Sequence, residues 1–246
     1  ACRFPAMIAD WRAHFGLPSL SFVFVQLAAY ARQSFVAIRM AQTNALKLPL
    51  VGFATAVDLG DPTSPFTSIH PRRKQEVGRR MSLSMLTIQY GRRDIVSQGP
   101  TPSGAVQLTP AGQALVGFAA GTADGLHFNG SAACTKCCAV SPFETMDGAS
   151  KWTRATASIN ARLGAGTVSL SSDGGAPIVG IRLMWDAYPE CALYNGVGDG
   201  DSHTAIAAPP FQWCAFGTVL NGPSWEASCE PHDPNDVYYP GATVRS

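Results

Sequence analysis

Charge and long apolar runs are both scarce in this sequence of 246 residues. Only 14% of the residues are charged and the net charge is +1, so the chain lacks the basic surface that binds nucleic acid or anionic membranes. No apolar run reaches the roughly 18 residues of a membrane-spanning helix. The longest, residues 20–29, contains Ser21 and Gln26. We therefore expect neither nucleic acid nor a membrane as a partner.

The beginning of the sequence also lacks the features of a secretory leader. Residues 1–11, ACRFPAMIADW, contain no initiator methionine, no basic segment and no apolar core. This pattern favours a chain that starts inside a longer polypeptide.

The seven cysteines lack the spacing of a zinc site. Cys134, Cys137 and Cys138 form a Cys-x-x-Cys-Cys group, but zinc would need a second pair of ligands, and a redox pair would open a helix beside a strand. We therefore expect no metal, no cofactor, and disulfides in a loop-rich setting. With the glycosylation sequon at Asn129, this indicates a secretory, lysosomal or extracellular location. A redox or zinc protein built on these cysteines remains an alternative.

Two kinds of apolar pattern alternate along the first 90 residues. Apolar residues recur with helical spacing, and short continuous apolar runs are typical of buried parallel strands. The predicted helices are residues 4–15, 34–46 and 71–90, and the predicted strands are residues 20–27 and 50–57. This order is half of an α/β layer fold. Two strands cannot cover both helical layers, so further strands would come from outside this chain.

Beyond residue 99, proline and glycine punctuate short alternating segments such as residues 106–109, 167–170 and 181–185. Alternation between turns predicts a β-rich, sandwich-like region. The predicted domains are residues 1–98, residues 99–216 and an irregular tail at 217–246. Trp152 and Trp185 are interpreted as core residues rather than sugar-stacking platforms.

Residues 57–78 place a histidine and two carboxylates after the second predicted strand. Asp58 and Asp61 follow that strand, and His70 stands just before the third helix, with Pro71 suited to its first turn. In open α/β sheets, ligands bind beyond the carboxyl ends of the strands. A lone histidine in a loop is also often only a hydrogen-bonded structural residue.

Residues 58–80, DLGDPTSPFTSIHPRRKQEVGRR, closely resemble the histidine block of the sialate O-acetylesterases, which are SGNH-hydrolase-like carbohydrate esterases. FPAMIADWRAHFG, FVFVQLAAY and IRMAQTNALKLP resemble the same family in the same order, as do IRLMWDAYPECALYN and APPFQWCAF downstream. The resemblance implies the back half of an SGNH-like three-layer α/β domain followed by a β-rich region. It also implies serine-type hydrolysis of O-acetyl esters on sialic acid or a related sugar, without a cofactor.

The resemblance assigns His70 as the general base that takes the proton from a serine nucleophile. In many relatives an aspartate stands two or three residues before this histidine, where this chain has Ser68 and Thr67. Asp61 and Asp58 are the remaining candidates to orient the imidazole. Asp61 is preferred because Asp58, at the strand end, is as easily a turn-capping residue.

The serine block of the family, similar to Gly-Gln-Ser-Asn, is absent before His70. Ser202 lies in a Gly-Asp-Ser sequence, but it follows the histidine and has no preceding strand, so a turn is the better interpretation. We expect the nucleophile on a missing N-terminal half of the catalytic domain, which would be this chain's partner. Arg72 and Arg73 could attract a sialate carboxylate, or could simply be a solvated helix start. The alternative function is a non-catalytic carbohydrate-binding or structural module derived from the esterase.

Overall fold

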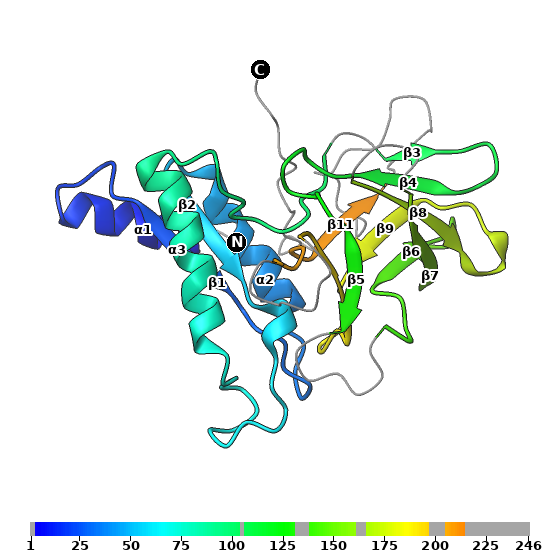
Figure 1. Cartoon of the computed structure of the whole chain (residues 1–246), viewed down its shortest axis with the longest axis horizontal. Helices are drawn as coiled ribbons and strands as arrows, with labels where there is room; N and C mark the ends of the chain where they lie inside the picture. The colour runs from blue at the N-terminus through cyan, green and yellow to red at the C-terminus, as the bar shows by residue number, and fades with distance from the viewer. Residues whose placement is uncertain (1–2, 104–105, 131–137, 161–165, 197–204, 215–246) are drawn as a thin grey trace.

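The computed structural model describes residues 3–103, 106–130, 138–160, 166–196 and 205–214. They form an α/β region, from α1 to α3, and a β-rich region, from β3 to β11, which lie side by side (Figure 1). Ser131 of the glycosylation sequon, Cys134, Cys137, Ser202 and the predicted tail lie outside the described residues.

The α/β region has the predicted order of helix, strand, helix, strand and helix. Its elements are α1 (Arg3–His14), β1 (Phe22–Gln26), α2 (Val36–Thr43) with the 3-10 turn η1 (Asn44–Lys47), β2 (Val51–Thr55), the 3-10 turn η2 (Val57–Leu59) and α3 (Lys74–Tyr90). β1 and β2 are parallel, with Phe22 opposite Val51. The strand predicted at residues 50–57 is shorter in the structure, because Val57 already belongs to η2.

Helices cover both faces of this parallel pair. On one face, the Phe4 ring of α1 meets the rings of Phe22 and Phe24 edge-on. On the other, α3 approaches β2 so closely that a Cβ added to Gly52 would lie 2.4 Å from Ser84 Oγ. Glycine at position 52 therefore permits the contact between α3 and the sheet.

The helix faces differ from the apolar pattern in the sequence. In α3 the apolar residues Val77, Met81, Met85 and Ile88, which recur about one turn apart, are only partly buried, whereas Glu76, Arg80 and Ser84 are its buried residues. In α2, Arg39 is fully buried. Its guanidinium donates to the carbonyl oxygens of Leu27 and Ala28 at 2.7 and 2.9 Å. Both helices thus turn charged side chains inward to satisfy backbone and carboxylate oxygens.

The β-rich region is a large curled antiparallel sheet with a separate strand pair. Its elements are β3 (Gln107–Leu108), β4 (Ala114–Gly117), β5 (His127–Gly130), β6 (Phe143–Met146), β7 (Trp152–Ile159), β8 (Thr167–Ser172), the 3-10 turn η4 (Asp173–Gly175), β9 (Gly180–Leu183), β10 (Cys191–Tyr194) and β11 (Phe211–Cys214). The seven-stranded sheet has the order β11-β9-β6-β7-β8-β4-β3, and β10 pairs with β5.

Aromatic side chains fill the core of the β-rich region. Phe143 and Phe211 are fully buried and meet edge-on, and Phe128 of β5 packs against Phe143. Trp152 and Trp185 are only partly buried. The guanidinium of Arg182 lies 4.2 Å from the centre of the Trp152 ring and 5.7 Å from that of Trp185.

A disulfide joins Cys138 to Cys191 at the start of β10, with a Cα–Cα distance of 4.6 Å. This pairing agrees with the expectation of disulfides for these cysteines. In the described part of the chain, no helix is long and apolar enough to cross a bilayer. The same part contains no cluster of three or more histidine, cysteine or carboxylate side chains suited to holding a metal ion.

Candidate active site

The carboxyl ends of β1 and β2 lie at the same edge of the sheet because the two strands are parallel. The loop that follows β2 carries all the predicted catalytic residues. It leaves the sheet through η2, passes Asp61 and His70, and enters α3 at Lys74. This edge is where ligands bind in open α/β sheets, so the conformation of the loop determines what the site can do.

Asp58 anchors the start of this loop in the interior of the protein. It is 2% exposed, and its two carboxylate oxygens accept from the terminal nitrogens of Arg80 at 2.7 and 2.8 Å. Burial alone would raise the Asp58 pKa, but the charge and hydrogen bonds of Arg80 outweigh it and hold the pKa below its ordinary value. The same guanidinium donates to the carbonyl oxygen of Thr55 at 2.9 Å, which ties α3 to the end of β2.

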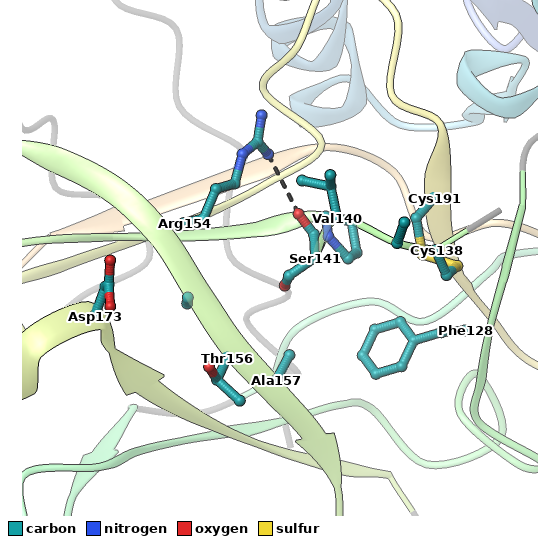
Figure 2. Close-up of a pocket in the computed structure, with 12 residues that line it drawn as sticks. Phe128, Cys138, Val140, Ser141, Arg154, Thr156, Ala157, Asp173 and Cys191 are labelled. Atoms are coloured by element: carbon teal, nitrogen blue, oxygen red, sulfur yellow. Dashed lines mark hydrogen bonds between the residues drawn. A yellow bond between two sulfur atoms is a disulfide. The ribbon is translucent and has the colours of Figure 1, made fainter. Parts of the chain in front are cut away.

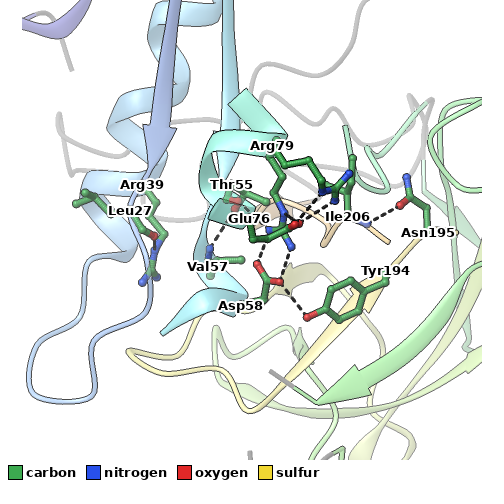
Figure 3. A network of polar contacts seen from close by, with 11 residues as sticks. Leu27, Arg39, Thr55, Val57, Asp58, Glu76, Arg79, Tyr194, Asn195 and Ile206 are labelled. Carbon is green, nitrogen blue, oxygen red and sulfur yellow. Dashed lines mark hydrogen bonds and ion pairs between the residues drawn. The ribbon is translucent and has the colours of Figure 1, made fainter. Parts of the chain in front are cut away.

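A second carboxylate and a tyrosine complete this buried network (Figure 3). Glu76 accepts from Arg80 Nε at 2.7 Å and from both Nε and Nη2 of Arg79 at 2.8 Å. The hydroxyl of Tyr194, in β10 of the β-rich region, donates to Asp58 Oδ2 at 3.0 Å. Burial, and then the charge of Asp58, raise the Tyr194 pKa well above its ordinary value, so this hydroxyl keeps its proton. The β-rich region is therefore hydrogen-bonded directly to the base of the loop.

Asp61 closes the middle of the loop by binding Arg72. Its carboxylate accepts from Arg72 Nε at 2.6 Å, from Nη2 at 2.9 Å and from the Arg72 backbone N–H at 3.2 Å. These hydrogen bonds, with the Arg72 charge, lower the Asp61 pKa to about 2. They also hold Arg72 outside the helix. Consequently α3 begins at Lys74, and Pro71 is a loop residue rather than part of the first helical turn as predicted.

His70 lies at the end of a tight turn, in the part of the loop between Asp61 and Arg72. Its backbone N–H donates to the Thr67 carbonyl at 2.9 Å, and its own carbonyl accepts from Ser64 Oγ at 2.6 Å. The side chain is exposed. Within the part of the chain that the structure describes, its imidazole makes no hydrogen bond. Backbone contacts thus fix the position of His70 and leave both ring nitrogens available to another molecule or segment.

The predicted site residues share one loop, but the structure does not bring all of them into contact. The Asp61 carboxylate binds Arg72, and the Asp58 carboxylate binds Arg80 and Tyr194, so neither is hydrogen-bonded to His70. Arg73 is exposed at the position before α3. Arg72, the other predicted substrate-binding residue, is half-exposed while paired with Asp61.

Gly60 allows the loop to pack tightly against the β-rich region. A Cβ at this position would lie 2.6 Å from the Tyr188 ring and 2.9 Å from the Ala29 carbonyl oxygen. The Tyr188 hydroxyl donates to the Gly60 carbonyl at 3.2 Å. The loop is therefore supported from both sides, by the loop that follows β1 and by the segment before β10.

Arg80, Glu76 and Tyr194 hold the site together but were not singled out in the sequence. The spacing of Glu76, Arg80 and Ser84 was a usable signal, because residues four apart lie on one helix face. Tyr194 carried no such signal, since it is 136 residues from Asp58 in the chain.

Comparisons with known proteins show which proteins the chain resembles. No protein-family model matches the sequence. Mouse sialate O-acetylesterase is 30% identical over 235 residues, covering 85% of this chain and 40% of the mouse protein. The rat sialate O-acetylesterase is 40% identical over 120 residues, covering 42% of this chain and 22% of the rat protein. The crystal structure of a carbohydrate acetylesterase from Xanthomonas citri superposes with a TM-score of 0.63 at 28% identity, covering 85% of this chain and 44% of that one.

The chain spans about 40% of the length of the mouse and human relatives that it matches. The mixed architecture of an α/β region and a large curled antiparallel sheet is shared with the carbohydrate acetylesterase. Over most of its length the chain is thus a homologue of the sialate O-acetylesterases, and it corresponds to the C-terminal portion of those proteins.

Proposed function

We propose that this chain is the histidine-bearing part of a carbohydrate esterase that removes O-acetyl groups from sialic acid or a related sugar. The observation that carries the proposal is the exposed imidazole of His70, which makes no hydrogen bond to any described residue, at the carboxyl edge of the parallel strands. Its loop is fixed by two carboxylate–guanidinium pairs. The relatives named as esterases support the reaction class.

In the proposed reaction, a ring nitrogen of His70 accepts the proton of a serine hydroxyl as the oxygen attacks the acetyl carbonyl. The imidazolium then gives this proton to the departing sugar oxygen, and water releases acetate from the acyl-serine. The serine would come from the missing N-terminal half of the catalytic domain, to which this chain would contribute the back half of an SGNH-like three-layer fold.

Asp61 and Asp58 support the His70 loop by different routes. Through Arg72, Asp61 fixes the residues on either side of the histidine, and through Arg80, Asp58 fixes the beginning of the loop. Direct acceptance of the second ring N–H of His70 by Asp61 stays a prediction. Arg72 and Arg73 would face the substrate from the entrance of α3.

A non-catalytic carbohydrate-binding module is the second candidate. It is favoured by the engagement of both loop carboxylates with arginines, together with Thr67 and Ser68 at the positions where many relatives have an aspartate. Such a module would keep the fold and the sugar contacts without a base that is oriented for proton transfer.

We also propose that the protein follows the secretory route to a lysosomal or extracellular location. The Cys138–Cys191 disulfide supports this, because disulfides persist mainly in oxidising compartments.

Acetate release tests the proposed function. The chain is expressed alone and together with the segment encoded immediately upstream, and each is incubated with O-acetylated sialic acid and with p-nitrophenyl acetate. The esterase proposal expects hydrolysis only when the upstream segment is present. Absence of hydrolysis in the combined protein, with the fold intact, supports the non-catalytic module.

A further inference from the structure

Two adjoining hollows lie on the β-rich region, next to the proposed catalytic edge. The first has a volume of about 520 Å³ and the second about 380 Å³. They share one wall, made of Val140, Ser141, Pro142, Arg154 and Cys191. Both volumes are in the range of small-molecule sites. Figure 2 shows the first hollow, with Phe128 and the Cys138–Cys191 disulfide on one side and Arg154 and Asp173 on the other.

The second hollow is connected to both loops at the carboxyl edge of the parallel strands. Ala187 and Tyr188 line it. The Ala187 carbonyl accepts from the Tyr30 backbone N–H at 3.2 Å, and the Tyr188 hydroxyl donates to the Gly60 carbonyl at 3.2 Å. Residues that line this hollow are therefore hydrogen-bonded to the loop that follows β1 and to the loop that carries His70.

The charge of the two hollows disfavours an anionic ligand. Among the described residues that line them, Arg154 is the single positively charged one, and it is accompanied by the carboxylates of Asp186 and Glu190 in one hollow and of Asp173 in the other. Arg154 is already paired with Asp186. A sialate carboxylate would have to displace Asp186 from Arg154 while remaining close to Glu190.

The Arg154–Asp186 pair suits neighbouring hydroxyl groups of an uncharged sugar. Both side chains are 38% exposed, so water already reaches them and a ligand can replace it. The guanidinium can donate to one sugar oxygen while the carboxylate accepts from the next hydroxyl. Tyr188 in one hollow and Phe128 in the other supply apolar surface for the ring carbons.

We propose that these hollows form a subsite for an uncharged sugar residue of the glycan, held by Arg154 and Asp186, and that the subsite excludes the sialate carboxylate. The choice of a glycan as the ligand rests on the proposed carbohydrate esterase function. The subsite itself does not require hydrolysis. Binding without turnover therefore separates a failure of this proposal from a failure of the esterase proposal.

The test compares lactose with 3′-sialyllactose, which is lactose carrying one sialic acid. Each is titrated into the chain while the backbone amide signals of residues 138–141, 154–157, 186–188 and 190 are followed by NMR. The variants are Arg154→Gln and Asp186→Asn. Arg92→Gln and Asp94→Asn are matched controls, because they alter an exposed ion pair that lines neither hollow. Amide spectra of every variant establish that it is folded.

Lactose should shift these signals, and each subsite variant should weaken its binding roughly tenfold, because each removes hydrogen bonds to a charged group. The control variants should bind lactose unchanged, and 3′-sialyllactose should bind no more tightly than lactose. Three results would overturn the proposal: no lactose binding, binding that neither subsite variant weakens, or tighter binding of 3′-sialyllactose that depends on Arg154. Glu190→Gln gives a second readout, since removing this charge should strengthen the binding of 3′-sialyllactose relative to that of lactose.

Discussion

Both regions of the molecule contribute to the apolar core, but they differ in the charged side chains that they bury. The α/β region buries charged side chains, with Asp58, Glu76 and Arg80 all below 8% exposed. The β-rich region buries large apolar side chains, with Phe143 and Trp213 at 0%. The buried ion pairs of the α/β region lie at the base of the loop that carries His70.

This difference indicates a division of roles between the regions. Ion pairs and hydrogen bonds are directional, so they specify where a loop is held. Apolar packing is non-directional and supplies most of the stability of a domain. In this protein the directional contacts fix the proposed catalytic loop, and the hydrogen bond from Tyr194 to Asp58 links that loop to the apolar region.

Truncation of the apolar core should cause the largest loss of stability in this comparison. Phe143→Ala removes a ring that packs against Phe128 and Phe211, and the free energy of unfolding should fall by about 3–5 kcal/mol. The loss should be the same at neutral and acid pH, because no charge is involved. Urea denaturation at both pH values measures it, and a strong dependence on pH would show that the two interiors do not differ as described.

Removal of the Asp58 carboxylate should lower the free energy of unfolding about as much as Phe143→Ala, for an electrostatic reason. Asp58→Ala leaves the Arg80 guanidinium buried without its bidentate partner, which typically costs about 3–5 kcal/mol. The same denaturation assay measures the change at neutral pH. Asp94→Ala is the control, because the Asp94 pair with Arg92 is exposed, and it should leave stability unchanged. Equal effects of the two substitutions would contradict a structural role for the buried network.

The hydrogen bond from Tyr194 to Asp58, which joins the two regions, should contribute less to the free energy of unfolding. Tyr194→Phe removes a donor to the Asp58 carboxylate, and the expected loss is about 1.5–3 kcal/mol, as for hydrogen bonds to charged groups. Hydrogen exchange should also increase in residues 58–73, because the base of their loop loses a contact. Tyr188→Phe, which removes a bond to the neutral Gly60 carbonyl, should have the smaller effect. A larger loss of stability in Tyr188→Phe than in Tyr194→Phe would mean that Tyr188 makes the stronger contact between the regions.

The smallest expected effect is the acid sensitivity of the Asp61–Arg72 pair. The Asp61 pKa of about 2 lies below the ordinary aspartate value of about 3.9. The pair therefore stabilises the fold above the ordinary value, and this contribution is lost as the pH falls toward 2. Asp61→Asn should reduce the slope of unfolding free energy against pH in that window. An unchanged slope would mean that Asp61 does not contribute through its charge.

The order of elements in the α/β region followed from the sequence, whereas the residues that hold the site did not. Continuous apolar runs and helical spacing predicted both parallel strands and all three helices, because these patterns are local. His70 was identified through the resemblance to the esterase family. The inward turn of Arg80 and its partnership with Asp58 depend on how α3 docks on the sheet, and the role of Tyr194 depends on contact between distant parts of the chain. No local pattern encodes either contact.

Acetate release by His70→Ala tests the proposed catalytic role of this loop most directly. The variant and the unmodified chain are each expressed with the upstream segment and assayed on O-acetylated sialic acid, with His14→Ala as a control at another exposed histidine. Turnover should fall about 10³-fold or more in His70→Ala and stay unchanged in His14→Ala. Both variants should keep the melting temperature of the unmodified protein. Undiminished acetate release by a folded His70→Ala protein would contradict the assignment of His70 as the base.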